Sequence, residues 1–242
     1  MEGKKIIEDS LLNCDLELVN AFCTSNFISK EVNTPIIEQL FKKGAEIIEV
    51  SKEVMEKLSD TKTCQEIAVT AKMKPLHIDR LEKEKLSFVV VCDRIKDPGN
   101  LGTIIRCACA FDASAVVILQ GTCYPYSPKV IRASAGKVFK IPIVFAGLDD
   151  LLHMNIKLIG TTPSGGVSLQ SSKIEEPLAI VLGEEASGIS SEIKEKIHSL
   201  LTIDIKDEAE SLNVASAACI CFYEINKEKN KNIRGNKILK EN

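Results

Sequence analysis

Polar side chains able to bind or activate a substrate occur in three short stretches of this sequence. The stretches are "DRIKDPGNLGTIIRCACAFDA" (93–113), "IVLGEEASGISSEI" (180–193) and "ESLNVASAACICFYE" (210–224). Their candidate residues are Asn100, Arg106, Glu184, Ser211 and Asn213. Arg106 has apolar neighbours on both sides in the sequence, so either a structural ion pair or an anionic ligand must balance its charge. The three stretches are therefore candidates for parts of one polar site.

Each of these residues also has a purely structural interpretation. Asn100 stands where a helix N-cap would accept a backbone amide bond, and Ser211 could cap the next helix in the same way. Gly183 would let a ligand approach the backbone closely, and Glu184 could order a polar network. The alternative for that stretch is a helix-capping turn whose acidic residues favour the helix N-terminus. Taken singly, the stretches favour these structural interpretations.

The elements that must position these residues form an alternating pattern after residue 87. Short apolar runs predict strands at 88–92, 115–120, 140–145, 157–162, 178–183 and 200–205. Helical spacing lies between them, at 99–111, 128–137, 147–154, 189–198 and 211–227. Nearly continuous apolar strands separated by helices predict a parallel sheet covered on both faces. Ligands of such sheets bind at the carboxyl ends of the strands, where the three stretches fall.

The first 80 residues have a different texture and predict a smaller α/β domain. Helical spacing is seen at 4–14 and 34–44, and strand-like alternation at 45–51 and 66–73. A charged segment at 79–87 without sustained periodicity marks the boundary. The segment 227–242 is polar and mainly basic, so we expect a loosely ordered tail that could help to hold RNA.

Composition excludes several classes of protein. The 242 residues are 45% hydrophobic with a net charge of -3, which argues against indiscriminate nucleic-acid binding but not against a local basic patch. The nine cysteines lack zinc-type spacing and predict reduced thiols in a cytoplasmic protein without a metal. No apolar run is long enough for a membrane span, and no signal peptide is recognisable. The turn at 97–100 is not GxGxxG, which disfavours a nicotinamide-dependent enzyme.

Taken together, the three stretches resemble the motifs of the SpoU, or TrmH-like, branch of the SPOUT RNA methyltransferases. Those motifs are Asn-x5-Arg after a strand that ends in Asp, "lvlGxE-x-x-Gls", and "SLNVs-x-A", and all three occur here in order. The stretch "SPKVIRASAGKVFKIPI" (127–143) is similar to the segment that the family has between the first two motifs. The resemblance covers residues 86–226.

The resemblance implies a fold, a cofactor and a reaction. The fold would be a parallel-sheet SPOUT domain at 86–226 with a deep trefoil knot, one of the few exceptions to the rule against knots. S-adenosyl-L-methionine would bind there, held by Thr161, Gly183, Ile203 and Leu212. The reaction would methylate a ribose 2′-hydroxyl of RNA. Arg106 would be the activating residue, positioned with the ribose by Asn100, Glu184, Ser211 and Asn213.

The same resemblance implies partners. The protein would be a homodimer, and residues 1–80 would be a substrate-binding domain for structured RNA, with ribosomal RNA favoured over transfer RNA. A non-catalytic RNA-binding protein with the same fold is the alternative. Two departures from the family pattern stand out. The apolar strand that usually leads into Glu2-Gly3 does not precede Met1, and Asp204 takes the place of a frequent proline.

Overall fold

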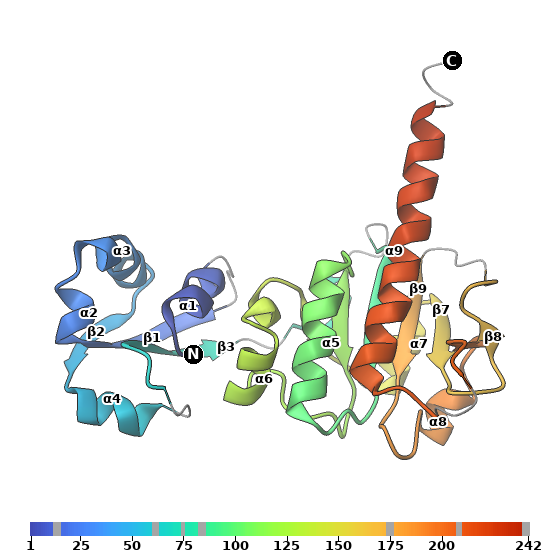
Figure 1. The fold of residues 1–242 in the computed structure, drawn as a ribbon, viewed down its shortest axis with the longest axis horizontal. Coiled ribbons are helices and arrows are strands. Elements are labelled where there is room, and N and C mark those ends of the chain that lie inside the picture. The colour runs from blue at the N-terminus through green and yellow to red at the C-terminus, as the bar shows by residue number, and fades with distance from the viewer. Residues whose placement is uncertain are drawn as a thin grey trace. The chain divides into compact units, whose positions relative to one another are not determined.

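The computed structural model describes residues 1–11, 16–59, 63–73, 76–81, 86–172, 177–206 and 210–238, with side chains through residue 229 (Figure 1). The chain divides into two compact units. The first is Met1–Pro75 with Ala135–Lys140, and the second is Leu76–Ser134 with Ile141–Asn242. The division thus falls at Pro75, ahead of the predicted boundary at residue 80, and the first unit also takes in six residues from the middle of the chain.

The first unit is a three-stranded sheet with short helices. Its elements are α1 (Lys4–Ser10), β1 (Leu16–Thr24), α2 (Ser25–Ile28), η1 (Glu31–Asn33), α3 (Thr34–Lys42), β2 (Glu46–Val50), α4 (Lys52–Leu58) and β3 (Ile67–Met73). The sheet order is β2-β1-β3, with β1 parallel to β2 and antiparallel to β3. Sequence alternation did not identify β1. A register shift between Leu18 and Asn20 interrupts the period of two there, as a β-bulge does.

The start of the chain pairs with β3. The amino group of Met1 donates to the Val69 carbonyl over 2.8 Å, and the Val69 amide donates to the Met1 carbonyl over the same distance. Glu2 forms an antiparallel bridge with Ala68. Met1 and Glu2 therefore lie beside β3 as a short extended segment. The family pattern has a strand leading into this position.

The second unit is built on a seven-stranded parallel sheet. Its strands are β4 (Phe88–Cys92), β5 (Ala115–Ile118), β6 (Ile143–Phe145), β7 (Lys157–Thr161), β8 (Val167–Ser168), β9 (Leu178–Leu182) and β10 (Ser199–Thr202). They are arranged in the order β6-β5-β4-β9-β7-β10-β8, and every paired neighbour is parallel. The predicted parallel α/β sheet is confirmed. The trefoil knot stays a prediction.

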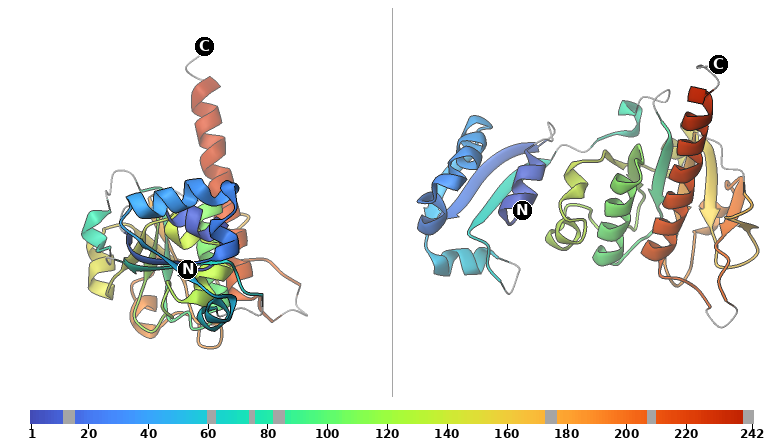
Figure 2. Two further views of the ribbon diagram at one scale, coloured as in Figure 1. Left: turned by 90° about the vertical axis from the view of Figure 1, so that its left-hand side faces the viewer. Right: turned by 45° about the horizontal axis from the view of Figure 1, so that its top comes forward.

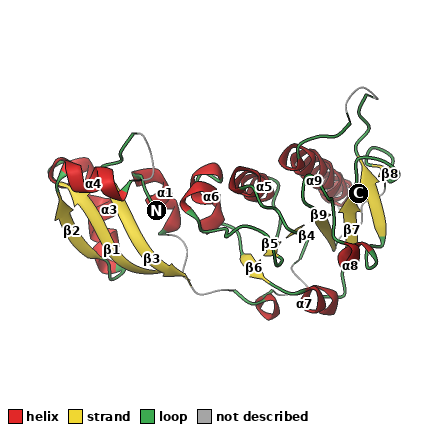
Figure 3. Ribbon diagram, turned by 90° about the horizontal axis from the view of Figure 1, so that it is seen from below, coloured by secondary structure: helices red, strands yellow, loops and turns green. Residues whose placement is uncertain are grey.

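Helices cover both faces of this sheet, as Figures 2 and 3 show. The helices of this unit are α5 (Pro98–Ala110), α6 (Pro128–Ala133), α7 (Leu148–His153), α8 (Ser191–Lys194) and α9 (Val214–Ile238), with the short η2 (Ile78–Arg80). The short η4 (Lys137–Phe139) belongs to the first unit. Figure 3 shows α5, α6 and α9 on one face and α7 and α8 on the other. Every residue of β4 and β9 is buried, which explains their uninterrupted apolar sequences.

The long helix α9 packs on the centre of the sheet and next to α5. Phe222 of α9 meets Phe88 of β4 with ring centroids 5.6 Å apart. The helix continues to Ile238 and so includes residues that the polar composition predicted to be loosely ordered. Polar contacts support this extension, because the Asn226 amide donates to the Phe111 carbonyl over 2.9 Å and Lys229 pairs with Asp112 at 2.7 Å. Of the helices that the structure describes, none is both long enough and apolar enough to cross a bilayer.

Candidate active site

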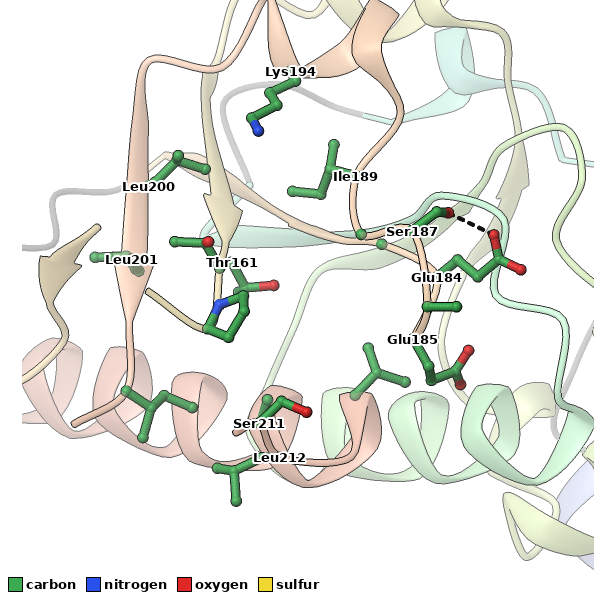
Figure 4. A pocket seen from close by; sticks show the side chains of 18 of the residues that line it. Thr161, Glu184, Glu185, Ser187, Ile189, Lys194, Leu200, Leu201, Ser211 and Leu212 are labelled. Carbon is green, nitrogen blue, oxygen red and sulfur yellow. Dashed lines mark hydrogen bonds between the residues drawn. The ribbon is translucent and has the colours of Figure 1, made fainter. Parts of the chain in front are cut away.

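A cavity of about 360 Å³ opens at the carboxyl ends of β7, β9 and β10 (Figure 4). Its lining combines apolar side chains with a few polar groups, which is the usual composition of a small-molecule site. Leu200, Leu201, Ile203 and Leu212 supply apolar surface, and Thr161, Glu184, Glu185, Ser187 and Ser211 supply polar groups. All four residues that the family resemblance implies for cofactor binding, Thr161, Gly183, Ile203 and Leu212, line this cavity.

A tight loop after β9 forms one wall of the cavity. The Gly188 amide donates to the Glu184 carbonyl over 2.8 Å, and Gly188 has a φ of +68°, a conformation that favours glycine. A β-carbon on Gly183 would lie 2.3 Å from the carbonyl carbon of Gly188. The space beside Gly183 is therefore filled by the protein's own loop, so this glycine is required for the loop to close as well as for any approach of a ligand.

Helix α5 begins one turn earlier than the Asn100 N-cap interpretation requires. The N-cap is Asp97, whose carboxylate accepts from the Asn100 backbone amide over 2.8 Å, and Pro98 occupies the first helical position. The alternative interpretation of Asn100 as the cap is wrong. Since the cap is supplied by Asp97, the Asn100 side chain is available for other contacts.

The Asn100 side chain joins all three sequence motifs. Its amide group donates to the Glu185 carboxylate, in the second motif. Its carbonyl oxygen accepts from the Asn213 side-chain amide over 3.0 Å, in the third motif. Glu185 follows Asn100 by 85 residues in the sequence, and Asn213 follows it by 113. Only the fold brings the three side chains together.

Glu184 and Glu185 have different surroundings. Glu184 pairs with Lys96 at 2.6 Å and accepts from the Ser187 hydroxyl over 2.7 Å, and these two contacts lower the pKa of Glu184. Glu185 bonds to Asn100 instead. The glutamate of the family motif stands two places after the glycine, which is Glu185 when counted from Gly183. Sequence reasoning selected the neighbouring glutamate and missed Glu185, although the Gly-x-Glu spacing was sufficient to find it.

The third motif positions Asn213 as the cap of α9. Its carbonyl oxygen accepts from the backbone amides of Ala215 and Ser216 over 2.9 and 3.3 Å. Ser211, the expected cap, stands outside the helix and lines the cavity, so that interpretation is wrong. Asn213 therefore uses one end of its side chain for the helix and the other for Asn100.

Arg106 lies apart from this network. Its side chain is exposed, whereas Ile104 and Ile105 are buried. Within the described residues, no hydrogen bond or ion pair engages its guanidinium. Six residues of α-helix separate it from Asn100, which corresponds to about 9 Å along the axis and a rotation of about 240°. Of the two alternatives that the sequence offers for balancing its charge, a structural ion pair is not found among the described residues, and an anionic ligand stays a prediction. The described chain also shows no contact by which the other four candidates position Arg106.

Asp204, which replaces a frequent proline of the family, ties the loop after β10 to the edge of the sheet. Its carboxylate accepts from the Ser168 hydroxyl of β8. Nearby, the Gly166 amide donates to the Thr202 hydroxyl over 2.9 Å. The loop that carries Ile203 into the cavity is thus held to β8 by the Asp204–Ser168 contact, and the absence of proline does not leave it without an anchor.

Comparison with known proteins identifies relatives for both units. The SpoU rRNA Methylase family matches residues 87–223, and the MRM3-like substrate binding domain matches residues 1–69. A relative from Bacillus subtilis, the 23S rRNA (guanosine(2553)-2'-O)-methyltransferase RlmP, is 33% identical over 189 residues, which are 75% of this chain and 73% of that protein.

Solved structures agree with this assignment. The AdoMet-bound rRNA methyltransferase from Sinorhizobium meliloti has a TM-score of 0.84 at 25% identity, over 94% of this chain and 86% of that one. The SpoU methyltransferase AviRb from Streptomyces viridochromogenes, in complex with AdoMet, has a TM-score of 0.85 at 22% identity over 95% and 89%, which supports the fold alone.

The fold and site together define an α/β protein of the SPOUT methyltransferase class, with a ligand cavity at the carboxyl ends of its parallel strands. The chain belongs to the SpoU rRNA methylase family.

Proposed function

We propose that this protein transfers a methyl group from S-adenosyl-L-methionine to a ribose 2′-hydroxyl of ribosomal RNA. The observation that carries the proposal is the Asn100 side chain, which bonds to Glu185 and Asn213 beside the cavity and so unites the three family motifs. The named activities of RlmP and of the Sinorhizobium meliloti enzyme support ribosomal RNA as the substrate.

The residues of the cavity fit the proposed cofactor. Leu200, Leu201 and Ile203 offer an apolar surface suited to an adenine ring, while polar groups such as Thr161 and Ser211 could bond to a ribose or an amino-acid moiety. The close turn at Gly183 presents backbone groups to the same space. When bound, the cofactor would supply an activated methyl group on a sulfonium, which makes a metal ion unnecessary for activating the methyl group.

The protein's task is then to orient the ribose hydroxyl and stabilise its developing negative charge. An arginine is a poor general base because its pKa exceeds 12. We infer that Arg106 holds the phosphate next to the target ribose and stabilises the forming alkoxide, while the hydroxyl proton passes to that phosphate or to water. Asn100 would fix the relative positions of the three motif segments around the reacting group.

The position of Arg106 supports a homodimer in which each active site contains residues of both subunits. The exposed guanidinium is separated from Asn100 by about 120° around α5 and about 9 Å along it, so it points away from the Asn100 network of its own chain. Exposed apolar side chains accompany it on neighbouring segments, namely Leu212, Ile220 and Tyr223. Joining two copies through α5 and α9 would cover these side chains and bring the partner's Arg106 to the cavity.

The first unit is the proposed RNA-binding domain. Its match to a substrate binding domain supports that role, and folded RNA suits recognition through shape and 2′-hydroxyl groups. Transfer RNA is the second candidate substrate. We also propose a cytoplasmic location, which is supported by the eight free thiols of the described residues and by the ribosomal RNA substrates of the relatives.

Two measurements test the function. Calorimetric titration with S-adenosyl-L-methionine, with NAD as the control, should give binding for the former alone. Mapping 2′-O-methylation in ribosomal and transfer RNA from cells with and without the gene should then show a site that is lost from ribosomal RNA in the deletion strain. Loss of a transfer RNA site instead would establish the second candidate, and loss of neither would refute the proposed activity.

A further inference from the structure

A strained residue follows β4 directly, beside the loop that forms the cavity wall. Arg94 has a φ of +58°, in the left-handed region that residues other than glycine rarely adopt. Such a conformation persists only where the surroundings determine it, and it is often found next to functional sites. None of the roles given above to the three motifs involves Arg94 or its neighbour Asp93.

Both residues contact the backbone of the loop after β9. The Asp93 carboxylate accepts from the Ser190 amide over 2.7 Å, and the Arg94 guanidinium donates to the Gly188 carbonyl over 3.2 Å. Asp93 and Arg94 also form an ion pair with 3.4 Å between Oδ1 and Nε. The residue between the two contacted backbone groups is Ile189, whose side chain lies at the cavity in Figure 4.

The carboxylate of Asp93 is only 4% exposed, so its contacts matter more than those of a surface ion pair. A buried charge requires hydrogen-bond donors, and here the donor is the backbone of the cavity wall. Removing that contact would leave the carboxylate poorly satisfied and would release Ser190. The buried Asp93 carboxylate and the position of the loop are therefore coupled.

The surrounding chain is shaped to accept Arg94. Gly121 has a φ of +88°, and a β-carbon there would lie 2.9 Å from Arg94 Cγ. The Thr122 hydroxyl donates to the Cys92 carbonyl over 2.9 Å and accepts from the Ile95 amide over 3.3 Å. The segment after β5 thus contacts the Arg94 side chain through Gly121, and through Thr122 it bonds to the backbone before and after Arg94. These contacts keep the Arg94 side chain directed to Gly188.

We propose that Asp93 and Arg94 are positioning residues that hold the 188–190 segment in its cofactor-binding conformation. This inference rests on the proposed cofactor. Neither residue is among those that line the cavity, so they would act through the backbone of Gly188 and Ser190 and through the placement of Ile189. Their effect should fall on cofactor affinity and much less on the rate once the site is filled.

Substitution of Arg94 tests this directly in the full-length protein. Arg94→Gly removes the guanidinium and accepts the positive φ, so the backbone strain is relieved and folding is preserved. We expect the Kd and the KM for S-adenosyl-L-methionine to rise about tenfold, as for the loss of a hydrogen bond to a charged group. The kcat at saturating cofactor should stay within about twofold of wild type.

Two further variants separate positioning from general stability. Arg94→Lys keeps the charge but lacks the planar fork, so its Kd should lie between those of wild type and Arg94→Gly. Lys72→Ala removes a surface ion pair with Glu17 at 3.2 Å and should leave cofactor affinity unchanged.

The proposal is overturned if Arg94→Gly binds the cofactor as tightly as wild type, or if its kcat falls while KM stays constant. A Kd that rises equally in Arg94→Gly and Lys72→Ala would also overturn it. Failure of the wild-type protein to bind the cofactor, alone and with ribosomal RNA present, would instead contradict the proposed function.

Discussion

The cavity side and the solvent side of helix α5 differ in how completely their polar groups are engaged. On the cavity side, Asn100 has partners in both other motifs, and the loop wall is held by Asp93 and Arg94. On the solvent side, Arg106 is exposed and has no polar partner among the described residues. We infer from this difference that one chain assembles the cofactor site by itself, whereas the RNA site is completed by further molecules.

The largest expected effect comes from the solvent side. Arg106→Ala should reduce turnover by about 100-fold or more, which is typical of removing a donor that stabilises a developing oxyanion. Cofactor affinity should change by less than twofold, because the cavity lining does not include Arg106. Single-turnover methylation and calorimetry measure the two quantities. Near-normal turnover in this variant would contradict the role given to Arg106.

A mixture of two variants tests the composite site. As homodimers, Arg106→Ala should be nearly inactive and Glu185→Ala should be clearly slower than wild type. Co-refolded heterodimers should recover activity, because one of their two sites would combine an intact Glu185 cavity with the partner's Arg106. If each Arg106 serves the cavity of its own chain, the heterodimer would contain no intact site and the activity of the mixture would not exceed that of the Glu185→Ala homodimer.

The two adjacent glutamates provide a smaller and sharper comparison on the cavity side. Glu185→Ala removes the partner of the Asn100 amide and should lower kcat about tenfold, as expected for loss of a charge-assisted hydrogen bond. Glu184→Ala breaks contacts with Lys96 and Ser187 and should cost less. Steady-state kinetics of both variants decide the order. A larger loss of kcat in Glu184→Ala than in Glu185→Ala would show that Glu184, the residue selected from the sequence, is the more important of the two.

The two functions of Asn213 can be separated by substitution. Asn213→Ala should lower the free energy of unfolding by about 1 kcal/mol through loss of the α9 cap, and it should also lower turnover. Asn213→Ser keeps an N-cap acceptor but lacks the longer amide side chain that donates to Asn100, so it should retain stability and still lose turnover. Denaturant unfolding and kinetics measured on the same samples distinguish the effects. Equal turnover in Asn213→Ser and wild type would show that the Asn100 contact is dispensable.

The smallest expected effect is on the pH dependence of folding stability. Lys96 and Ser187 lower the pKa of Glu184 in the folded protein, so its contribution to stability is present above the ordinary value of 4.5 and is lost as pH falls through the lowered value. The difference in melting temperature between wild type and Glu184→Gln should therefore shrink below about pH 4. A difference that is constant from pH 7 to pH 3 would indicate that the Lys96 contact contributes nothing.

Apolar patterning predicted most of the larger domain, because buried parallel strands such as β4 and β9 must be apolar throughout. It missed β1, where a register shift near Leu18 interrupts the alternation. The alternative interpretations of Asn100 and Ser211 as helix caps are also wrong. Several polar residues near each helix start could serve as the cap, and only the three-dimensional contacts show that Asp97 and Asn213 do so.

The candidate site was less predictable for a related reason. Motif spacing identifies which segments take part, and the four residues that the resemblance implies for cofactor binding do line one cavity. The division of roles between Glu184 and Glu185 depends on which way each side chain points after a tight turn. The exposure of Arg106 depends likewise on how α5 packs against α6 and α9, which local sequence does not specify.

The dual use of the Asn213 side chain links local opening of a helix to the state of the site. The first-turn amides of Ala215 and Ser216 are protected only while Asn213 faces them, and the same residue holds Asn100. Fluctuations that break the cap would therefore loosen the contact between the first and third motifs at the same moment. The rate of hydrogen–deuterium exchange at these two amides thus reports on site assembly, and it can be measured without any substrate RNA.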